Sequence, residues 1–294
     1  MSELPRIQLV SSLPSMPQRD DDANKGDCGR VLVVAGSRGM SGAACLSASG
    51  ALRGGAGLVT LAVPVEIVDI VSTYQPSYLT LALADDEHGR LQQTALQQLA
   101  QVLPKQSAVA VGPGLGQSAV LAELAFELYN TISVPAVFDA DALNLLAKRP
   151  YLLKRAADSP ARILTPHPGE FSRLTGKSID EIQANRTQSA VEFAKKNNVV
   201  VVLKGQNTVV TDGTRVAINT TGNSGMATGG TGDVLTGVLA ALLAQKMTAF
   251  DAAQLGVHLH GLAGDLAAEE LSKPGMIATD LLHYLGRAWC DLGQ

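Results

Sequence analysis

A glycine-rich loop that runs directly into an apolar segment is the stretch of this chain best suited to chemistry. Residues 219–245 read NTTGNSGMATGGTGDVLTGVLAALLAQ, and their one carboxylate, Asp233, stands where the polar loop ends. Glycine lets backbone N–H groups approach a ligand closely, and a helix start leaves donors unpaired at the positive end of its dipole. The pattern predicts a phosphate site with Asp233 beside it as a general base. The alternative is a glycine-rich turn in which Asp233 only caps the helix.

Four more clusters of glycine and polar residues each follow a short apolar run that has the composition of a buried strand. The clusters are GPGLG at 112–116, DAD at 139–141, HPGE at 167–170 and KGQNT at 204–208. In an open parallel sheet, ligands bind beyond the carboxyl ends of the strands. We therefore expect these clusters and the glycine loop to meet at one edge of a sheet and form a single site.

The polar side chains in these clusters also have structural interpretations. Asp141 could cap the helix that follows it, because aspartate is a favoured cap. His167 could be a solvated or hydrogen-bonded loop residue, although its place on the expected ligand edge favours contact with a ligand. Lys204 could be an ordinary surface charge. His258 and His260 would face different sides of a helix, which argues against a metal site there.

The segments that must position these residues alternate between strand-like and helix-like patterns. Short apolar runs rich in β-branched residues predict strands, and amphipathic or small-residue stretches predict helices. Strands are expected at 30–36, 57–63, 78–83, 108–111, 136–138, 162–164, 199–203, 208–211 and 216–218. Helices are expected at 43–53, 91–102, 119–129, 179–195, 234–244, 252–270 and 279–291.

This alternation predicts an α/β fold with a mostly parallel central sheet and helices on both faces. The segment TVVTDGTRVAI differs, because two apolar runs joined by Asp212 and Gly213 are typical of a hairpin, which would add a small antiparallel edge. Residues 1–26 are polar and contain three prolines, so we expect an N-terminal arm that packs on the body. Residues 27–294 are expected to form a single domain.

Composition limits the classes of partner. The 294 residues are 46% hydrophobic, carry a net charge of −4 and have no long basic run, so we expect neither nucleic acid nor a membrane surface as a partner. No apolar run approaches the roughly 20 residues of a membrane span. Three scattered cysteines fit a reducing compartment. We expect a cytoplasmic protein.

Seven blocks of the sequence carry a resemblance to a known family. They are GRVLVVAGSRGMSGAA, SGALRGGAGLVT, VGPGLG, FDADALN, TPHPGEFSRL, VVLKGQNTVV and NSGMATGGTGDVLTGVLAALLAQ. In this order they resemble the ADP-dependent NAD(P)H-hydrate dehydratase family of the ribokinase-like superfamily, over nearly the whole chain from about residue 27. Such proteins are often fused to an N-terminal epimerase domain. Too few residues precede Gly29 for one, so we expect a stand-alone dehydratase.

The resemblance implies repair of hydrated nicotinamide cofactors. (S)-NADHX and (S)-NADPHX would be dehydrated to NADH and NADPH, while ADP is converted to AMP and phosphate. Asp233 would be the catalytic base, removing the proton of the ring hydroxyl that attacks the terminal phosphoryl group of ADP. Backbone groups would stabilise the transferring phosphoryl group at Gly229, Gly230 and Gly232. The AMP portion would be held by Lys204, Gly205, Gln206, Asn207 and Thr208.

The resemblance also implies contacts to the hydrated dinucleotide and to magnesium. The dinucleotide would be contacted by Ala43, Gly114, His167 and Asp233. Glu170 corresponds to the glutamate of the Asn-x-x-Glu motif of superfamily kinases, so it would lie near Mg²⁺. ADP is the expected phosphoryl donor, although the sequence leaves ADP and ATP open.

Two alternatives and two partners complete these expectations. A ribokinase-like kinase acting on a small alcohol or vitamin precursor would share the glycine loop and the base. A nucleotide-binding regulatory protein could keep the pocket without turnover, but it would have little need for the base. The apolar C-terminal helices, expected to be exposed, and the habit of the family favour a homo-oligomer such as a tetramer. A separate NAD(P)H-hydrate epimerase is the expected functional partner.

Overall fold

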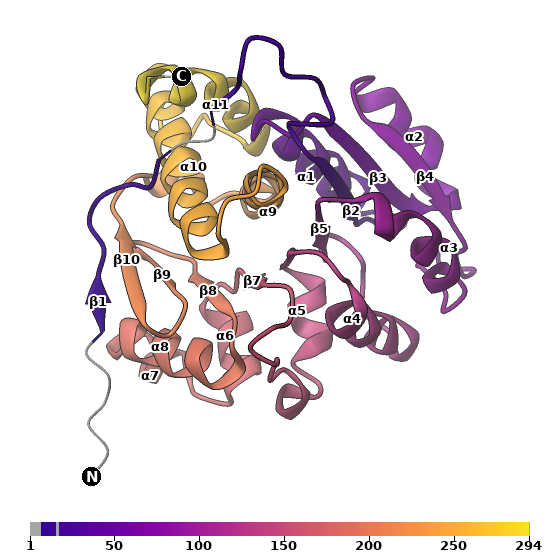
Figure 1. Ribbon diagram of the computed structural model, residues 1–294, viewed down its shortest axis with the longest axis horizontal. Coiled ribbons are helices and arrows are strands. Elements are labelled where there is room, and N and C mark those ends of the chain that lie inside the picture. Colours follow the sequence, from indigo (N-terminus) through magenta and orange to yellow (C-terminus); the bar gives the residue numbers. More distant parts are fainter. Residues whose placement is uncertain (1–6, 16–17, 294) are drawn as a thin grey trace.

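The computed structural model describes residues 7–15 and 18–293, which contain one ten-stranded sheet (Figure 1). Its strands are β1 (Gln8–Leu9), β2 (Arg30–Val34), β3 (Leu58–Pro64), β4 (Leu79–Leu83), β5 (Ala108–Val111), β6 (Ala136–Phe138), β7 (Arg162–Leu164), β8 (Val200–Leu203), β9 (Thr208–Thr211) and β10 (Arg215–Asn219). They lie in the order β1-β10-β9-β8-β7-β6-β5-β2-β3-β4.

Helices connect most of these strands and complete the C-terminal part. They are α1 (Ser41–Arg53), α2 (Val68–Tyr74), α3 (Ala95–Val102), α4 (Ala119–Thr131), α5 (Asp141–Leu146), α6 (Pro168–Thr175), α7 (Ile179–Ala184), α8 (Arg186–Asn197), α9 (Thr231–Ala244), α10 (Ala249–Leu271) and α11 (Ala278–Asp291). No helix in residues 7–15 and 18–293 is long and apolar enough to cross a bilayer.

The direction of the strands agrees with the predicted fold class. Among the strands of the described chain, β9 alone runs against its neighbours, β8 and β10, and the other adjacent pairs are parallel. The predicted hairpin at Asp212 and Gly213 joins β9 to β10. The mostly parallel sheet with a small antiparallel part is thus confirmed. From β2 the chain builds outward to β4, then returns to place β5 on the other side of β2, and ligands bind at such a switch of direction.

Most expected elements lie within four residues of their predicted ends, and β5, β6, β7 and β9 have the predicted bounds. Strand β1 and helix α2 are not predicted by the sequence patterns, and the short helices α5 and α6 lie where a helix is expected only without bounds, after Asp141 and after the HPGE turn. The segment 179–195 was expected to be one helix, and this expectation is wrong. Asn185 takes a non-helical backbone conformation (φ −139°, ψ 47°) and separates α7 from α8.

Helices cover both faces of the sheet (Figure 1). Successive strand residues point to opposite faces, so β2 contributes Val31 and Val33 to one core and Leu32 and Val34 to the other. The first core includes residues of α1, α2, α9, α10 and α11, and the second those of α3 to α8. The central strands are therefore held between two packed layers.

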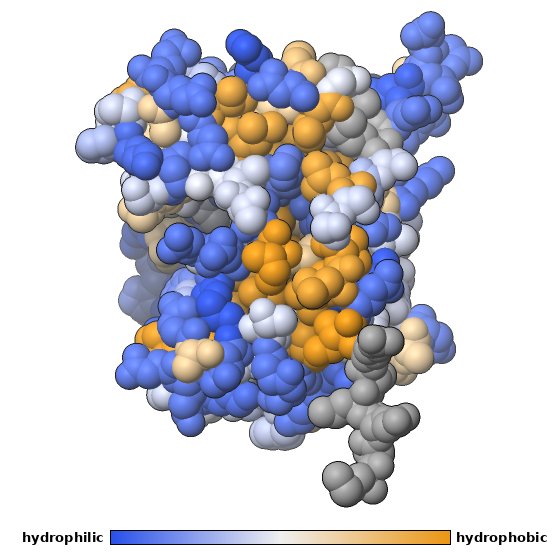
Figure 2. Space-filling model, turned by 90° about the vertical axis from the view of Figure 1, so that its left-hand side faces the viewer, coloured by the Kyte–Doolittle hydropathy of each residue, from blue (hydrophilic) through white to orange (hydrophobic). Residues whose placement is uncertain are grey.

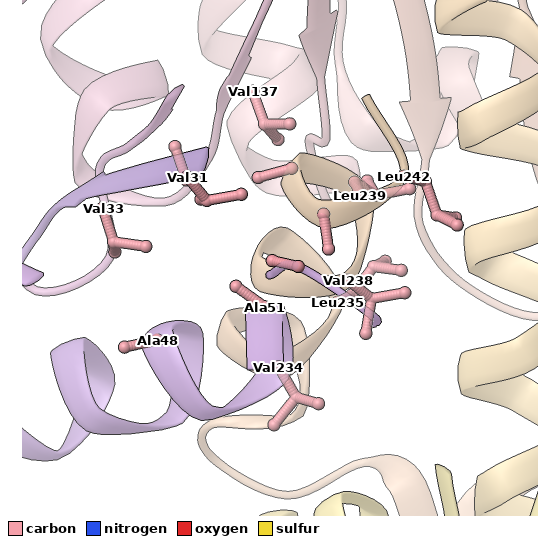
Figure 3. Close-up of a cluster of buried hydrophobic side chains, with 14 of the residues drawn as sticks. Val31, Val33, Ala48, Ala51, Val137, Val234, Leu235, Val238, Leu239 and Leu242 are labelled. Atoms are coloured by element: carbon pink, nitrogen blue, oxygen red, sulfur yellow. The ribbon is translucent and has the colours of Figure 1, made fainter. Parts of the chain in front are cut away.

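Helix α9, which begins at the glycine loop, is central to the first core (Figure 3). Its residues 234–244 are all buried, as the apolar run predicts. A Cβ on Gly237 would lie 1.9 Å from the carbonyl oxygen of Ser47 in α1, so glycine is required for this close approach of the two helices. Side chains of α9 pack beside Ala48 and Ala51 of α1 and toward β2 (Figure 3). This packing fixes the start of α9 relative to the sheet.

The described part of the N-terminal arm lies against the body. Strand β1 pairs parallel with β10, and Gln254 of α10 donates a hydrogen bond of 2.8 Å to the carbonyl oxygen of Ser12. Residues 1–6 and 16–17 of the predicted arm are outside the described residues. The division into an arm at 1–26 and a single domain at 27–294 stays a prediction.

Apolar side chains gather on the face that carries β1 and β10, as Figure 2 shows. Leu9 of β1 is 76% exposed, and Ile218 of β10 is 38% exposed. Within α10 and α11, by contrast, Leu259, Leu281 and Leu285 are fully buried. The expectation that the apolar faces of the C-terminal helices are exposed is wrong, because these faces complete the first core.

Candidate active site

The carboxyl ends of β5 and β6 touch each other at the predicted ligand edge. Gly112 follows β5 with φ 135°, and a Cβ there would lie 1.9 Å from the carbonyl oxygen of Asp139. Asp141 accepts hydrogen bonds of 2.8 Å from the Gly116 amide and from the Gln117 side chain. Its carboxylate therefore holds the GPGLG loop, and the helix-cap interpretation of Asp141 is not what the structure has.

The glycine loop enters α9 through Gly230, which is the N-cap residue and has a φ of 93°, a left-handed conformation that favours glycine. Asp233 is the third residue of the helix and not its cap, so the cap alternative does not hold. N–H groups in a first helical turn have no partner within the helix, and they point toward the loop end. His260 of α10 bonds the carbonyl oxygen of Thr231 at 2.8 Å and so fixes this first turn from outside.

Lys204, at the end of β8, reaches the end of β6. Its Nζ donates to Asp139 Oδ1 at 2.7 Å and lies 3.9 Å from Glu170 Oε2. Asp139 is 1% exposed, and its second oxygen accepts a bond of 2.6 Å from the Thr236 hydroxyl in α9. A Cβ on Gly232 would lie 3.3 Å from the same Nζ. Strand ends β6, β7 and β8 and the start of α9 thus converge, and Lys204 is not a simple surface charge.

Burial and the neighbouring carboxylates of Asp139, Asp141 and Glu170 together raise the pKa of Asp233 to about 7, against the lowering effect of the Lys204 charge. Burial likewise raises the pKa of Glu170. A base works best when its pKa is near the operating pH, because it is then largely ionised yet still binds a proton well. Asp233 therefore has the protonation behaviour that general-base catalysis at neutral pH requires.

His167 is the N-cap of α6 and forms a capping box with Glu170. Its Nδ1 accepts from the Gly169 amide at 3.0 Å, and its own amide donates to Glu170 Oε2 at 2.8 Å. Burial and the charges of Lys204 and Arg173 lower the pKa of His167, so the imidazole is neutral at neutral pH. His167 is therefore hydrogen-bonded within its own turn, while half of its side chain is exposed, and its contact with a ligand stays a prediction.

Ala43 and Gly114, both predicted to contact the dinucleotide, lie side by side. A Cβ on Gly114 would lie 3.1 Å from the Ala43 side chain and 2.8 Å from the Met40 carbonyl oxygen. The Ser37 hydroxyl donates to the Gly114 carbonyl oxygen at 2.8 Å and ties the two glycine turns together. The turn after β2 and the turn after β5 therefore form one wall at the switch point of the sheet.

A cavity of about 660 Å³ opens beside the start of α9. Its lining includes Gly232 and all five residues of the predicted AMP segment, 204–208. Ala43, Gly114, His167, Gly229, Gly230 and Asp233 are not part of this lining. Lys204 lines the cavity and also contacts Asp139 and Glu170. The structure thus joins the cavity and the polar edge through Lys204, and the charges of this edge act on Asp233.

Several residues that line the cavity are not among the site residues that the sequence predicts. They are Asn219, Thr220, Thr221, Gly222, Asn223, Ser224, Met226, Ala227, Leu235, Val257, His260, Gly261 and Lys273. The glycine loop was singled out only for its phosphate-binding end, whereas its first half forms a wall of the cavity together with α10. His260 had been considered as a metal ligand and set aside. Burial lowers its pKa to about 4, so it is a neutral hydrogen-bond donor to α9.

No three His, Cys, Asp or Glu side chains of residues 7–15 and 18–293 converge as a metal-ligand group. The carboxylates of Asp139 and Glu170 are nevertheless both within 4 Å of the Lys204 ammonium. Magnesium prefers oxygen ligands and often uses one or two carboxylates together with water and substrate phosphates. The donor chemistry of this edge fits such a partial site.

Comparisons with known proteins show which family this chain resembles. The family model described as NAD(P)H-hydrate dehydratase matches residues 31–287. The bifunctional NAD(P)H-hydrate repair enzyme of Moorella thermoacetica is 44% identical over 92% of this chain and 51% of its own length. The chain thus spans about half the length of that curated relative. The ADP-dependent (S)-NAD(P)H-hydrate dehydratase of Bacillus subtilis is 35% identical over 94% of both chains.

Solved structures give the same result. A crystal structure of the ADP/ATP-dependent NAD(P)H-hydrate dehydratase of Bacillus subtilis, co-crystallised with ATP and Mg²⁺, has a TM-score of 0.80 and 32% identity over 94% of both chains. A ribokinase of Arabidopsis thaliana, with a TM-score of 0.53 and 13% identity over 87% of this chain and 98% of that one, shares the fold. The ribokinase-like fold class is thus confirmed.

Proposed function

The chain belongs to the NAD(P)H-hydrate dehydratase family, and on this premise we propose that it dehydrates (S)-NADHX and (S)-NADPHX to NADH and NADPH. ADP would be converted to AMP and phosphate in the same reaction. The relative that matches over 94% of both chains carries the name of this activity. The single observation that carries the proposal is Asp233, a carboxylate with a pKa of about 7 at the junction of the glycine loop and α9.

ADP would bind in the cavity beside α9. The segment 204–208 would contact the AMP portion, and the terminal phosphoryl group would lie against the glycine-rich start of the helix at Gly229, Gly230 and Gly232. Gly232 leaves free the space that a Cβ would fill beside Lys204, which supports a close approach of phosphate oxygens. A helix start with unpaired N–H groups suits such a charge.

Magnesium would be held near Glu170, with the phosphates and water as further ligands. Glu170 is buried and lies next to Asp139 and Lys204, so oxygen donors are available at the phosphoryl end of the cavity. Bound Mg²⁺ would supply charge neutralisation of the phosphoryl oxygens. The relative co-crystallised with ATP and Mg²⁺ supports this assignment.

The reaction would proceed in two steps. Asp233 takes the proton of the ring hydroxyl, whose oxygen forms a bond to the terminal phosphorus of ADP while the bond to the bridging oxygen breaks and AMP leaves. The lone pair of the ring nitrogen then expels phosphate as the carbon–oxygen bond breaks. Loss of a proton from the neighbouring ring carbon restores the double bond of the nicotinamide. Ala43, Gly114 and His167 would contact the dinucleotide so that its hydroxyl faces Asp233.

We further propose a cytoplasmic homo-oligomer, such as a tetramer, that acts together with a separate NAD(P)H-hydrate epimerase. The apolar face with Leu9 and Ile218 supports self-association, because exposed apolar areas often mark interfaces. The bifunctional repair enzymes among the relatives support the link with an epimerase, since their name describes two activities in one chain.

Absorbance at 340 nm tests the proposal directly. Purified protein is mixed with Mg²⁺, hydrated NADH and either ADP or ATP, and the band of NADH is followed. A rise that requires nucleotide is the expected result, and the comparison of the two nucleotides identifies the donor. No rise with a protein that binds nucleotide would refute the dehydratase and favour the kinase of a small alcohol.

A further inference from the structure

We propose that the ammonium of Lys204 contacts the phosphoryl group that is transferred, and that Asp139 and Thr236 are positioning residues that hold it there. The inference rests on the proposed function for the identity of the reaction. It moves Lys204 from the AMP portion, which the resemblance implies, to the reacting end of ADP.

The ammonium of Lys204 lies at the start of α9. Lys204 Nζ lies beside Gly232, within 3.3 Å of the position a Cβ would take, and Gly232 is in the first turn of α9. The unpaired N–H groups of that turn form the natural seat of a phosphoryl group. The side chain is 20% exposed and belongs to the lining of the cavity, so a ligand can reach it. The remaining cavity, along 205–208 and 219–224, offers room for the rest of the nucleotide.

Asp139 and Thr236 hold the ammonium of Lys204 in place. Asp139 is 1% exposed and uses one oxygen for Lys204 and the other for the Thr236 hydroxyl. Thr236 is fully buried in α9, one turn after Gly232, and its hydroxyl also lies 3.2 Å from the Gly232 carbonyl oxygen. The chain from Lys204 through Asp139 to Thr236 therefore ties the ammonium to the helix that would bind phosphate. A buried carboxylate satisfied on both oxygens has little freedom to move.

Lys204 is the cation among three carboxylates at this edge. The Lys204 ammonium is bonded to Asp139 at 2.7 Å and lies 3.9 Å from Glu170, and Asp233 is the third carboxylate of this region. A phosphoryl group entering among three carboxylates needs a cation at the point of entry. The Lys204 ammonium is already at that point, beside Gly232 at the start of α9.

Binding of two nucleotides tests the place of Lys204 without any need for turnover. Lys204→Met removes the charge and keeps the stem, and calorimetry compares ADP with AMP. We expect the affinity for ADP to fall by at least about tenfold and that for AMP to stay within about threefold, because a charge-assisted bond to the terminal phosphate is lost. Equal weakening of both nucleotides would overturn the inference alone. Failure of the unaltered protein to bind ADP would overturn the proposed function as well.

Turnover of matched Thr236 variants tests the positioning role. Thr236→Val keeps the shape and removes the hydroxyl, and we expect kcat to fall about tenfold with the KM for ADP within about twofold. Thr236→Ser keeps the hydroxyl and should retain kcat within about twofold. In the Lys204→Met background, Thr236→Val should change kcat no further, because residues that act through one another are not additive. Independent, multiplicative losses would refute the link.

Discussion

The buried carboxylate of Asp233 supports turnover but lowers the stability of the folded protein at pH 8. Asp233→Asn is expected to lose turnover and to gain stability. The variant keeps the shape of the side chain and removes the charge. We expect turnover to fall by a factor of about 10² to 10⁴ because the general base is lost, with ADP binding within about threefold because the glycine loop is intact. We also expect the variant to be more stable than the unaltered protein at pH 8.

The size of the stabilisation follows from the pKa. A rise from 3.8 to about 7 corresponds to about 4 kcal/mol between the two protonation states. The folded state binds a proton at Asp233 more tightly than the unfolded state does. Proton binding therefore adds fully to the free energy of unfolding below pH 4, this stabilisation is lost as the pH rises toward 7, and it is absent at pH 8. Asparagine does not titrate, so the gain in stability of the variant over the unaltered protein is greatest at pH 8. At pH 5 this gain shrinks to roughly a third of its value at pH 8.

Part of the unfavourable energy of the ionised Asp233 is shared with the neighbouring carboxylates. We therefore expect Asp233→Asn to raise the free energy of unfolding by about 2–4 kcal/mol at pH 8. For 294 residues the unfolding entropy is about 0.6 kcal/mol/K, which converts this into a Tm increase of roughly 3–6 °C. Calorimetric melts of both proteins at pH 5 and pH 8 measure it. A variant no more stable than the unaltered protein at pH 8, or equally more stable at both pH values, would refute the reasoning about burial.

Asp212→Asn is the matched control with the opposite sign. Burial alone would raise the pKa of Asp212, but hydrogen bonds from Arg215 and Thr214 lower it. The carboxylate therefore stabilises the fold above the unfolded pKa, and this stability is lost as the pH falls through the folded pKa. The same substitution is expected to lower the Tm at pH 8 at Asp212 and to raise it at Asp233.

Three further outcomes can be measured. The value of kcat/KM should fall by up to about tenfold per pH unit below about pH 7 as Asp233 becomes protonated, and a flat rate profile between pH 5.5 and 8 would contradict its role as base. Gly237→Ala should lower the free energy of unfolding by about 1–3 kcal/mol because its Cβ meets Ser47. Gly286→Ala in α11 meets no atom within 4 Å and should raise the free energy of unfolding by about 0.5–1 kcal/mol. Denaturant unfolding compares the two variants. Asp141→Ala should raise the KM for hydrated NADH several-fold and spare that for ADP, because Asp141 holds the Gly116 loop and not the cavity; steady-state kinetics with unchanged KM for hydrated NADH would refute this.

Local patterns in the sequence determined most of the framework. The valine-rich runs at 31–34 and 200–203 lie in buried strands because β-branched residues pack well within a parallel sheet. The Asp212–Gly213 hairpin and the helix after the glycine loop follow from turn geometry and from the apolar run. Residues just after each strand were expected at one edge, and the ends of β6, β7 and β8 do meet there.

Only the tertiary structure decided the electrostatics and the shape of the site. Asp139 meets Lys204 across 65 residues and Thr236 across 97 residues, contacts that depend on the order of the strands and not on any local pattern. The pKa of Asp233 depends on how deeply the packed layers bury it and on which carboxylates they bring near. The cavity wall formed by 219–224 and α10 likewise exists only after α10 packs beside the loop. Residue types and spacing predict which groups are present, whereas long-range packing sets their distances and their charge.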